Sequence, residues 1–330
     1  MTVAMIIGIT GQDGLYMAEL LSKKEYSIVG VVRDISKAKK IIPEVIKKRL
    51  KLVEWDMLDQ SKIVEVLNDN RPKELYNFAA YSSGAGMFDD AVNIGDVNGL
   101  AVTRVLDAVR AVDTKIRFCQ ASSSEMFGEV AQSPQNELTE FSPRSPYGAA
   151  KVYAHSMIDV YRKKYGLFLC SAILFNHESP RRGHQFVTRK ISYEAAKIKL
   201  GLSTELLLGD LDSYRDWGFA GDYVRGMWQM LQQKKADDYV FATGLVYSVR
   251  NLCEIAFSHL DLDYRDYVVS DSKSYRPPEK FQLVGDSSKA RSELNWLPEM
   301  NFKSLISLMV DNDLENLMRH NNKNNMSDNK

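Results

Sequence analysis

The residues whose types and spacing best suit chemistry are Tyr147 and Lys151, in the run Tyr-Gly-Ala-Ala-Lys. Four residues apart on a helix, a phenol and an ammonium lie on one face. A cation beside a phenol favours the phenolate, so we expect Tyr147 to act as a base near neutral pH. The predicted helix follows Ser122 to Glu125, where a predicted strand ends, and both groups are expected at the ligand crevice there. A surface pair that arose by chance is the alternative.

A glycine-rich turn provides the second chemical signal. Gly8, Gly11 and Gly14 stand in the run GITGQDG, after a predicted strand and before a predicted helix. Glycines there allow a tight turn and a close approach of the backbone to a pyrophosphate, whose charge faces the helix N-terminus. The sequence therefore predicts a dinucleotide site, with ordinary turn glycines as the alternative.

The residue that reads the adenosine ribose is expected roughly 20 residues after the glycine loop. The second predicted strand ends in Val32-Arg33-Asp34. A carboxylate at Asp34 accepts hydrogen bonds from a 2′-hydroxyl and repels a 2′-phosphate, whereas Arg33 favours the phosphate. We therefore predict NAD, with NADP as the alternative, and a helix cap by Asp34 stays open. Asp56 is a candidate adenine contact or a loop cap.

Alternating strand and helix patterns position these residues. Unbroken apolar runs predict strands at 3–9, 27–32, 51–54, 74–79, 116–121 and 168–175. Helical patterns lie at 15–22, 61–67, 97–112, 147–165, 187–200 and 222–232. This alternation predicts an α/β fold, a Rossmann-type doubly wound parallel sheet, followed by a smaller mixed C-terminal substrate-binding domain.

We predict a domain boundary after residue 175. Residues 1–175 form the expected dinucleotide-binding domain, which also receives a segment near 216–247, and residues 176–330 form the substrate-binding region. Residues 320–330 are polar apart from Met326 and are expected to be disordered.

Composition argues against several classes of protein. The chain has 330 residues, with 43 Lys and Arg against 43 Asp and Glu. Zero formal charge removes the usual signal for nucleic-acid or membrane-surface binding, so neither partner is expected. Three dispersed cysteines and five scattered histidines predict reduced thiols and no metal site. Without a signal peptide or an apolar run that could cross a bilayer, a cytoplasmic location is expected.

Together these motifs resemble the extended short-chain dehydrogenases/reductases that act on nucleotide sugars, and among them the GDP-mannose 4,6-dehydratase family. The matching runs span most of the chain: GITGQDG (8–14), YNFAA (76–80), ASSSEMFGE (121–129), SPRSPYGAAKVYA (142–154), LFNHESPRRG (174–183), FVTRKI (186–191), RDWGFAGDYV (215–224) and RPPEKFQLVGDSSKA (276–290).

The resemblance implies an internal redox cycle on a bound GDP-sugar. Tyr147, assisted by Lys151 and Ser123, takes the C4 hydroxyl proton while hydride passes from C4 to the nicotinamide. Glu125 then takes the C5 proton, which the new 4-keto group acidifies; water leaves C6 and the hydride returns there. The alternative is a GDP-sugar 4-dehydrogenase, acting for example on a GDP-heptose, that stops at the 4-keto sugar with NADH formed.

The resemblance also assigns binding residues. It implies cofactor contacts by Gly8, Gly11, Gln12, Asp13, Gly14, Arg33, Asp34, Asp56, Met57, Ala79, Ala80, Tyr147, Lys151, His177 and Arg182. It implies substrate contacts by Ser82, Ser83, Glu125, Asn176, Lys190, Arg215, Arg276 and Glu279, with the arginines facing the diphosphate and ribose.

Departures from the family pattern bear on substrate and assembly. Ser83 and Gly84 replace a family histidine and valine, and this smaller wall favours a manno-heptose over mannose, with both left open. Phe219 and Tyr247 replace family histidines. The loop after Arg33-Asp34 is rewritten as a lysine-rich stretch, 37–51, which is predicted to be helical. In the family this loop supports a tetramer, so both a homodimer and a homotetramer are expected, with helices 97–112 and 147–165 as interface candidates.

Overall fold

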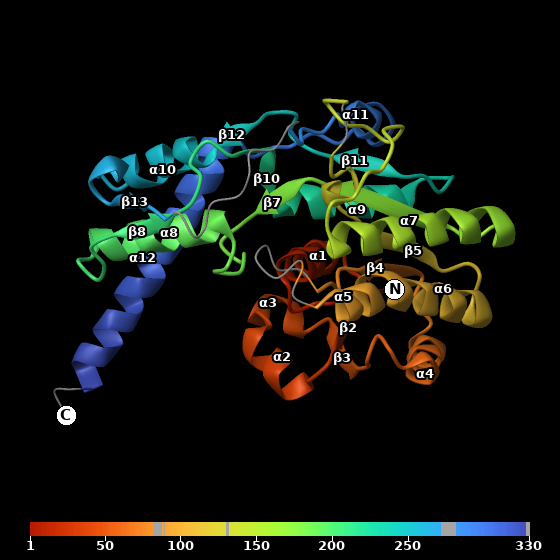
Figure 1. Cartoon of the computed structure of the whole chain (residues 1–330). Helices are drawn as coiled ribbons and strands as arrows, with labels where there is room; N and C mark the ends of the chain where they lie inside the picture. The colour runs from red at the N-terminus through yellow and green to blue at the C-terminus, as the bar shows by residue number, and fades with distance from the viewer. Residues whose placement is uncertain (82–87, 89, 130–131, 272–281, 328–330) are drawn as a thin grey trace.

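The computed structural model describes residues 1–81, 88, 90–129, 132–271 and 282–327. Its centre is a seven-stranded parallel sheet in the order β11-β6-β5-β4-β1-β2-β3 (Figure 1). The strands are β1 (Val3–Ile7), β2 (Ser27–Val32), β3 (Leu50–Glu54), β4 (Glu74–Asn77), β5 (Arg117–Ala121), β6 (Leu169–Leu174) and β11 (Tyr239–Phe241). The predicted fold class is confirmed.

Helices cover both faces of this sheet, which is why its strands are apolar without alternation. One buried cluster joins the sheet to α1 (Gln12–Lys23), α2 (Ile35–Ile41), α3 (Glu44–Lys47), α9 (Ala220–Gln232) and α11 (Ser288–Leu294). A second cluster joins the other face to α4 (Gln60–Asn70), α6 (Ala101–Val112) and α7 (Pro146–Tyr165). Short turns complete this part: α5 (Ala91–Gly95), η1 (Asp96–Leu100) and η2 (Ser124–Met126).

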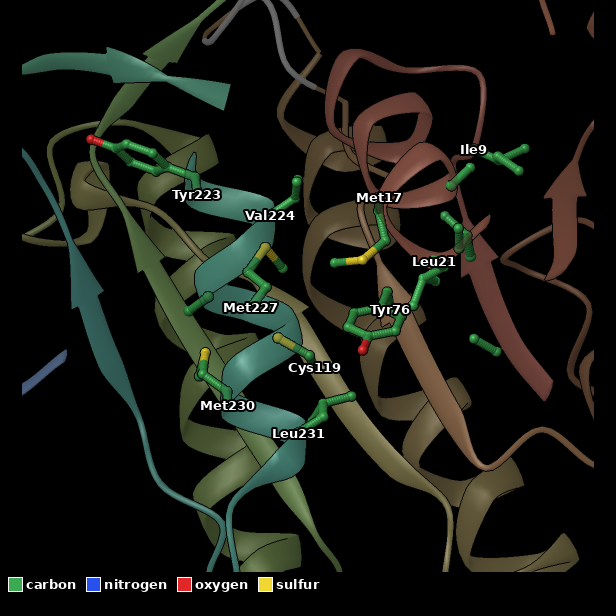
Figure 2. Close-up of a cluster of buried hydrophobic side chains, with 14 of the residues drawn as sticks. Ile9, Met17, Leu21, Tyr76, Cys119, Tyr223, Val224, Met227, Met230 and Leu231 are labelled. Atoms are coloured by element: carbon green, nitrogen blue, oxygen red, sulfur yellow. The ribbon is translucent and has the colours of Figure 1, made fainter. Parts of the chain in front are cut away.

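The chain returns to the sheet after residue 219. Figure 2 shows Met227 and Met230 of α9 lying over the sheet near Cys119 of β5, with Met17 and Leu21 of α1 beside them. β11 follows α9 and pairs with β6, which makes β11 one of the two edge strands of the sheet, opposite β3. Residues of the C-terminal half therefore help to build the layer that carries the glycine loop.

The other C-terminal elements form a smaller mixed layer with its own core. Three strand pairs belong to it: β7 (Asn176–Glu178) with β10 (Trp217–Phe219), β9 (Tyr214–Arg215) with β12 (Tyr247–Ser248), and β8 (Leu206–Leu208) with β13 (Val268–Ser270). Its helices are α8 (Val187–Lys199), α10 (Val249–Ser258), η3 (Tyr264–Asp266) and α12 (Phe302–Ser327). No helix in the described ranges is both long and apolar enough to span a membrane.

Two segments differ from the prediction. The stretch 37–51 is helical only in part, because Pro43 has no amide hydrogen to continue a helix and Leu50 already begins β3. Residues 320–327, expected to be disordered, continue α12. Each residue that extends an existing helix gains a backbone hydrogen bond without a new nucleation cost, which explains the continuation.

A buried ion pair ties α12 to α8. Arg189 Nη2 lies 2.6 Å from Asp313 Oδ1, and their side chains are 8% and 1% exposed. The Ser192 hydroxyl donates to Asp313 Oδ2 at 2.7 Å. Burial raises the pKa of Asp313 by more than Ser192 and Arg189 lower it, so the intact pair gives little net stabilisation.

We predict that Asp313→Ala lowers the free energy of unfolding by about 3 kcal/mol or more, because it leaves the Arg189 charge buried without its partner. Urea denaturation measures the change. Asp311→Ala on the same helix is the control, since Asp311 pairs with His259 at the surface. Its loss is expected to cost less than about 1 kcal/mol. Equal losses in the two variants would show that the buried pair has no special role.

Candidate active site

The glycine loop adopts a backbone geometry that side chains would prevent. Gly8 has a φ of +79°, and a Cβ there would lie 2.9 Å from the backbone nitrogen of Ala79. A Cβ on Gly14 would lie 2.4 Å from the Gly8 carbonyl oxygen. The loop thus brings the end of β1 against the chain at Ala79 and Ala80, after β4, and starts α1 there. Unpaired amides at this helix N-terminus fit the pyrophosphate of a dinucleotide.

A buried ion pair crosses from this loop to the C-terminal half. His177 Nε2 lies 3.0 Å from Asp13 Oδ2, and its Nδ1 lies 2.8 Å from the Phe175 carbonyl oxygen. Burial lowers the pKa of His177, but the Asp13 carboxylate outweighs it and the pKa is raised. Burial also acts to raise the pKa of Asp13, and His177 overcomes this effect, so that pKa is lowered. Each group therefore favours the charged form of the other.

Gln12 reinforces the same junction. Its Nε2 donates to the His177 carbonyl oxygen at 3.0 Å, and its Oε1 accepts from the Ser179 hydroxyl at 2.8 Å. Tyr223 stacks on the His177 ring with a centroid separation of 4.8 Å. Sequence reasoning missed Ser179 and Tyr223 as site residues. The signal was available, because they stand in the runs NHESPRRG and RDWGFAGDYV.

The residues after β2 and β3 serve as caps. Asp34 Oδ1 accepts from the Lys37 amide at 2.9 Å, and Oδ2 lies 3.4 Å from Lys37 Nζ. This is the helix cap that the sequence left open, and Arg33 is exposed beside it. Asp56 accepts from an amide two residues on at 2.9 Å, a loop cap, and Met57 next to it is buried.

Ser123, Glu125 and Tyr147 come together where α7 begins, beyond the end of β5. The Ser123 hydroxyl is hydrogen-bonded to the Tyr147 phenol, and the Glu125 charge lies near enough to raise the pKa of that phenol. Gly148 permits this packing, since a Cβ there would lie 2.5 Å from the Glu125 carbonyl oxygen. Ser145 caps the helix by accepting from the Gly148 amide at 3.1 Å.

Burial dominates the proton affinities of Tyr147 and Lys151. Burial raises the pKa of Tyr147 to about 12, although the hydrogen bond with Ser123 acts to lower it. Burial lowers the pKa of Lys151 to about 8. Lys151 Nζ donates to the Ala121 carbonyl oxygen at 2.8 Å and lies 5.6 Å from the centre of the Tyr147 ring. In this structure the pKa of the Tyr147 phenol is raised rather than lowered, and the role of Lys151 in making Tyr147 a base stays a prediction.

Arg182 belongs to the same site. Its charge acts to lower the pKa of Tyr147, its Nε lies 3.1 Å from Glu178 Oε2, and its guanidinium lies 3.6 Å from the centre of the Phe186 ring. The ion pair and the ring hold this cation in place. Among the described residues, no group of three or more His, Cys, Asp and Glu side chains could hold a metal.

The predicted sugar-nucleotide residues lie in the C-terminal layer. Asn176 begins β7, directly before His177. The Lys190 ammonium donates to the Leu207 carbonyl oxygen at 2.6 Å, and Arg215 Nη1 donates to the Tyr214 carbonyl oxygen at 2.6 Å. The remaining predicted contacts lie outside the described residues: Ser82, Ser83, Arg276 and Glu279.

The two aromatic residues that differ from the family pattern are packing residues. Phe219 lies edge-on to Tyr16 at a centroid separation of 5.3 Å. Tyr247 stacks on Phe302 at 4.1 Å. Phe219 thus packs β10 against α1, and Tyr247 packs β12 against α12.

We predict that the Asp13–His177 pair stabilises the fold more at pH 6 than at pH 9. A histidine whose folded pKa is raised adds stability below its unfolded pKa, about 6.5, and loses it as the pH rises through the folded value. The difference in unfolding free energy between the protein and His177→Gln measures this contribution. His155→Gln is the control, because burial lowers the pKa of His155 and the difference should move in the opposite direction. A His177 difference that is independent of pH would rule out the charged pair.

Comparison of the chain with known proteins identifies its family. The family model for GDP-mannose 4,6 dehydratase matches residues 5–309. GDP-mannose 4,6 dehydratase 2 of Arabidopsis thaliana is 46% identical over 325 residues, which cover 95% of this chain and 87% of the relative. The human GDP-mannose 4,6 dehydratase is 44% identical over 346 residues, or 97% of this chain and 93% of that protein.

Solved structures agree on the fold. A dTDP-glucose 4,6-dehydratase from Bacillus anthracis, in complex with NAD, superposes with a TM-score of 0.81 at 19% identity, covering 96% of this chain and 97% of that one. The sequence matches identify the family as well as the fold, because they extend through the glycine loop, the Ser123 region, the start of α7 and the NHESPRRG run. The chain belongs to the GDP-mannose 4,6-dehydratase family.

Proposed function

We propose that this protein is a nucleotide-sugar 4,6-dehydratase that uses NAD(P) and acts on GDP-mannose or a GDP-manno-heptose. The observation that carries the proposal is the meeting of Ser123, Glu125 and Tyr147 close to the glycine loop. Oxidation at C4 alone needs only the proton acceptor Tyr147 and leaves the Glu125 carboxylate without a role. The names of the relatives support the GDP-sugar class.

The described residues divide the chemistry between them. Tyr147 exchanges the C4 hydroxyl proton, and Ser123 orients the phenol through its hydrogen bond. Lys151 contributes a buried positive charge that favours a developing negative charge at this end of α7. Bound NAD(P) supplies the hydride acceptor and donor. Glu125 takes the proton from C5, made acidic by the C4 ketone, and hydroxide leaves C6. Of the two protons then held by Tyr147 and Glu125, one converts the hydroxide to water and the other protonates C5 as hydride returns to C6.

We infer NAD rather than NADP from the end of β2. Backbone donation from Lys37 lowers the pKa of Asp34, so this carboxylate stays charged and repels a 2′-phosphate. Arg33 is exposed and free to turn toward a phosphate, which keeps NADP as the alternative. Equilibrium binding of the two dinucleotides tests the choice, and tighter binding of NADP would reverse it.

We also propose a cytoplasmic homo-oligomer, a dimer or a tetramer, whose contact involves α6 and α7. Exposed apolar side chains on η1 and α7 support this contact, namely Leu100, Tyr153, Val160 and Tyr165. The three cysteines are free and buried, which supports a reducing compartment. Sedimentation that gives the mass of a single chain would contradict the oligomer, and recovery of the protein outside the cytosolic fraction would contradict the location.

Sugar turnover without added nicotinamide tests the proposed reaction. We expect GDP-mannose or GDP-manno-heptose to lose one water with no net formation of reduced cofactor, because the hydride returns to the sugar. Product mass and the absorbance of reduced nicotinamide measure both quantities. Loss of two hydrogens with stoichiometric NADH would instead identify a 4-dehydrogenase. A higher kcat/KM for the heptose is expected because the small residues Ser83 and Gly84 replace a histidine and a valine of the family, and the reverse order would exclude heptose preference.

Glu125→Gln is predicted to lower kcat for dehydration by roughly 10²- to 10⁴-fold, the usual contribution of a positioned acid or base. Transient formation of reduced cofactor should persist, because C4 oxidation does not use this carboxylate. Glu129→Gln is the matched control, an exposed carboxylate four residues along the same loop. Dehydration that is unchanged in Glu125→Gln, or equally reduced in both variants, would remove Glu125 from the mechanism.

A further inference from the structure

The zero net charge of the chain conceals a strongly basic patch. The basic segment, residues 37–51, contains six lysines and one arginine but a single acidic residue, Glu44. α2 and α3 carry most of it beside β3, the edge strand at the opposite side of the sheet from β11 (Figure 1). No residue of this segment belongs to the predicted catalytic or binding set, so the proposed reaction leaves the charge unexplained.

Part of this charge has no counterpart in the protein. Lys39, Lys40 and Lys48 are exposed. None of their side-chain ammonium groups makes a hydrogen bond or an ion pair with any residue that the structure describes. The other basic side chains each contact an acidic or amide oxygen: Lys37 with Asp34, Lys47 with Glu44, Arg49 with Glu25 and Lys51 with Asn70. Three ammonium groups are therefore available to an external anion.

Aliphatic side chains stand exposed among these lysines. Ile41 and Val45 are 52% and 68% exposed, on either side of the turn at Pro43 between α2 and α3. A cavity of about 430 Å³ opens at the same helices, and its lining combines aliphatic groups with two ammonium groups: Ile35, Lys39, Ile42, Lys47, Leu50 and Leu52. The segment thus offers apolar surface and positive charge together.

We propose that the basic segment docks the protein reversibly on an anionic lipid bilayer. Ile41 and Val45 enter the boundary between headgroups and acyl chains, while Lys39, Lys40 and Lys48 meet lipid phosphates. This combination of aliphatic groups and cations suits an anionic membrane interface. The remainder of the chain is net negative, so attraction is confined to this face and fixes the orientation of the docked protein.

Other partners fit these observations less well. A second copy whose own basic segment met this one at a two-fold axis would bring like charges together, which is repulsive. A nucleic acid would pair with the lysines but would gain nothing from Ile41 and Val45. The exposed aliphatic residues therefore favour a lipid surface over either alternative.

Vesicle flotation with the full-length protein tests the proposal. We expect binding to vesicles of equal phosphatidylcholine and phosphatidylglycerol, no binding to phosphatidylcholine alone, and release at high salt as the charges are screened. Lys39→Ala combined with Lys40→Ala should lower the partition coefficient about tenfold or more. The exposed pair Lys234 and Lys235, both changed to alanine, is the control and should leave the coefficient unchanged.

A second pair of variants separates insertion from charge attraction. Ile41→Ser combined with Val45→Ser should lower the partition coefficient several-fold with sugar turnover unchanged, whereas Leu138→Ser, at a side chain 92% exposed elsewhere, should have no effect. Circular dichroism checks that each variant is folded. The proposal is overturned by absence of binding to the anionic vesicles, by equal effects of the two lysine pairs, or by an unchanged Ile41/Val45 variant. Tighter binding to a DNA duplex, or dissociation of an oligomer by the Lys39/Lys40 change, would likewise refute it in favour of those partners.

Discussion

The buried pair of Asp13 and His177 is the contact on which the site depends. It joins residues 164 positions apart, one at the start of α1 and one in β7. Because β7 pairs with β10 and Tyr223 of α9 stacks on the same imidazole, this contact also fixes where the C-terminal layer meets the sheet. A buried charge without its partner is costly, so this pair disfavours arrangements of the two halves of the chain in which Asp13 and His177 do not meet.

Lys151 and Tyr147 show a reversed order of acidity, with the lysine the stronger acid of the two. The cause is burial away from water, which disfavours the charged phenolate and the charged ammonium alike. Near neutral pH the phenol is therefore protonated and the ammonium mostly charged, so the resting site holds little free base. In the proposed reaction, proton acceptance by Tyr147 is therefore coupled to the departure of hydride from the sugar.

Much of the architecture could be predicted from the sequence, because unbroken apolar runs leave few choices for a sheet covered on both faces. The glycine loop was predictable for a similar reason, since Gly8 and Gly14 tolerate no side chain. The cap formed by Asp34 could be named only as an alternative, since the same residue suits two roles. Proton affinities could not be predicted, because the burial of Lys151 and its bond to Ala121 arise from tertiary packing. The bond between Ser179 and Gln12 also arises from tertiary packing, so the sequence could indicate Ser179 only through its place in the run NHESPRRG.

The return of the chain to form α9 and β11 has a consequence for how such proteins can be recombined. Exchanging everything beyond β6 would also exchange α9, one of the helices on that sheet face, and β11, whose loss or poor fit would leave β6 as an unpaired edge open to pairing with another chain. The substrate-binding region is thus not one continuous segment that can be exchanged by itself. A graft between relatives would have to keep residues 220–241 with the recipient and transplant the flanking pieces separately.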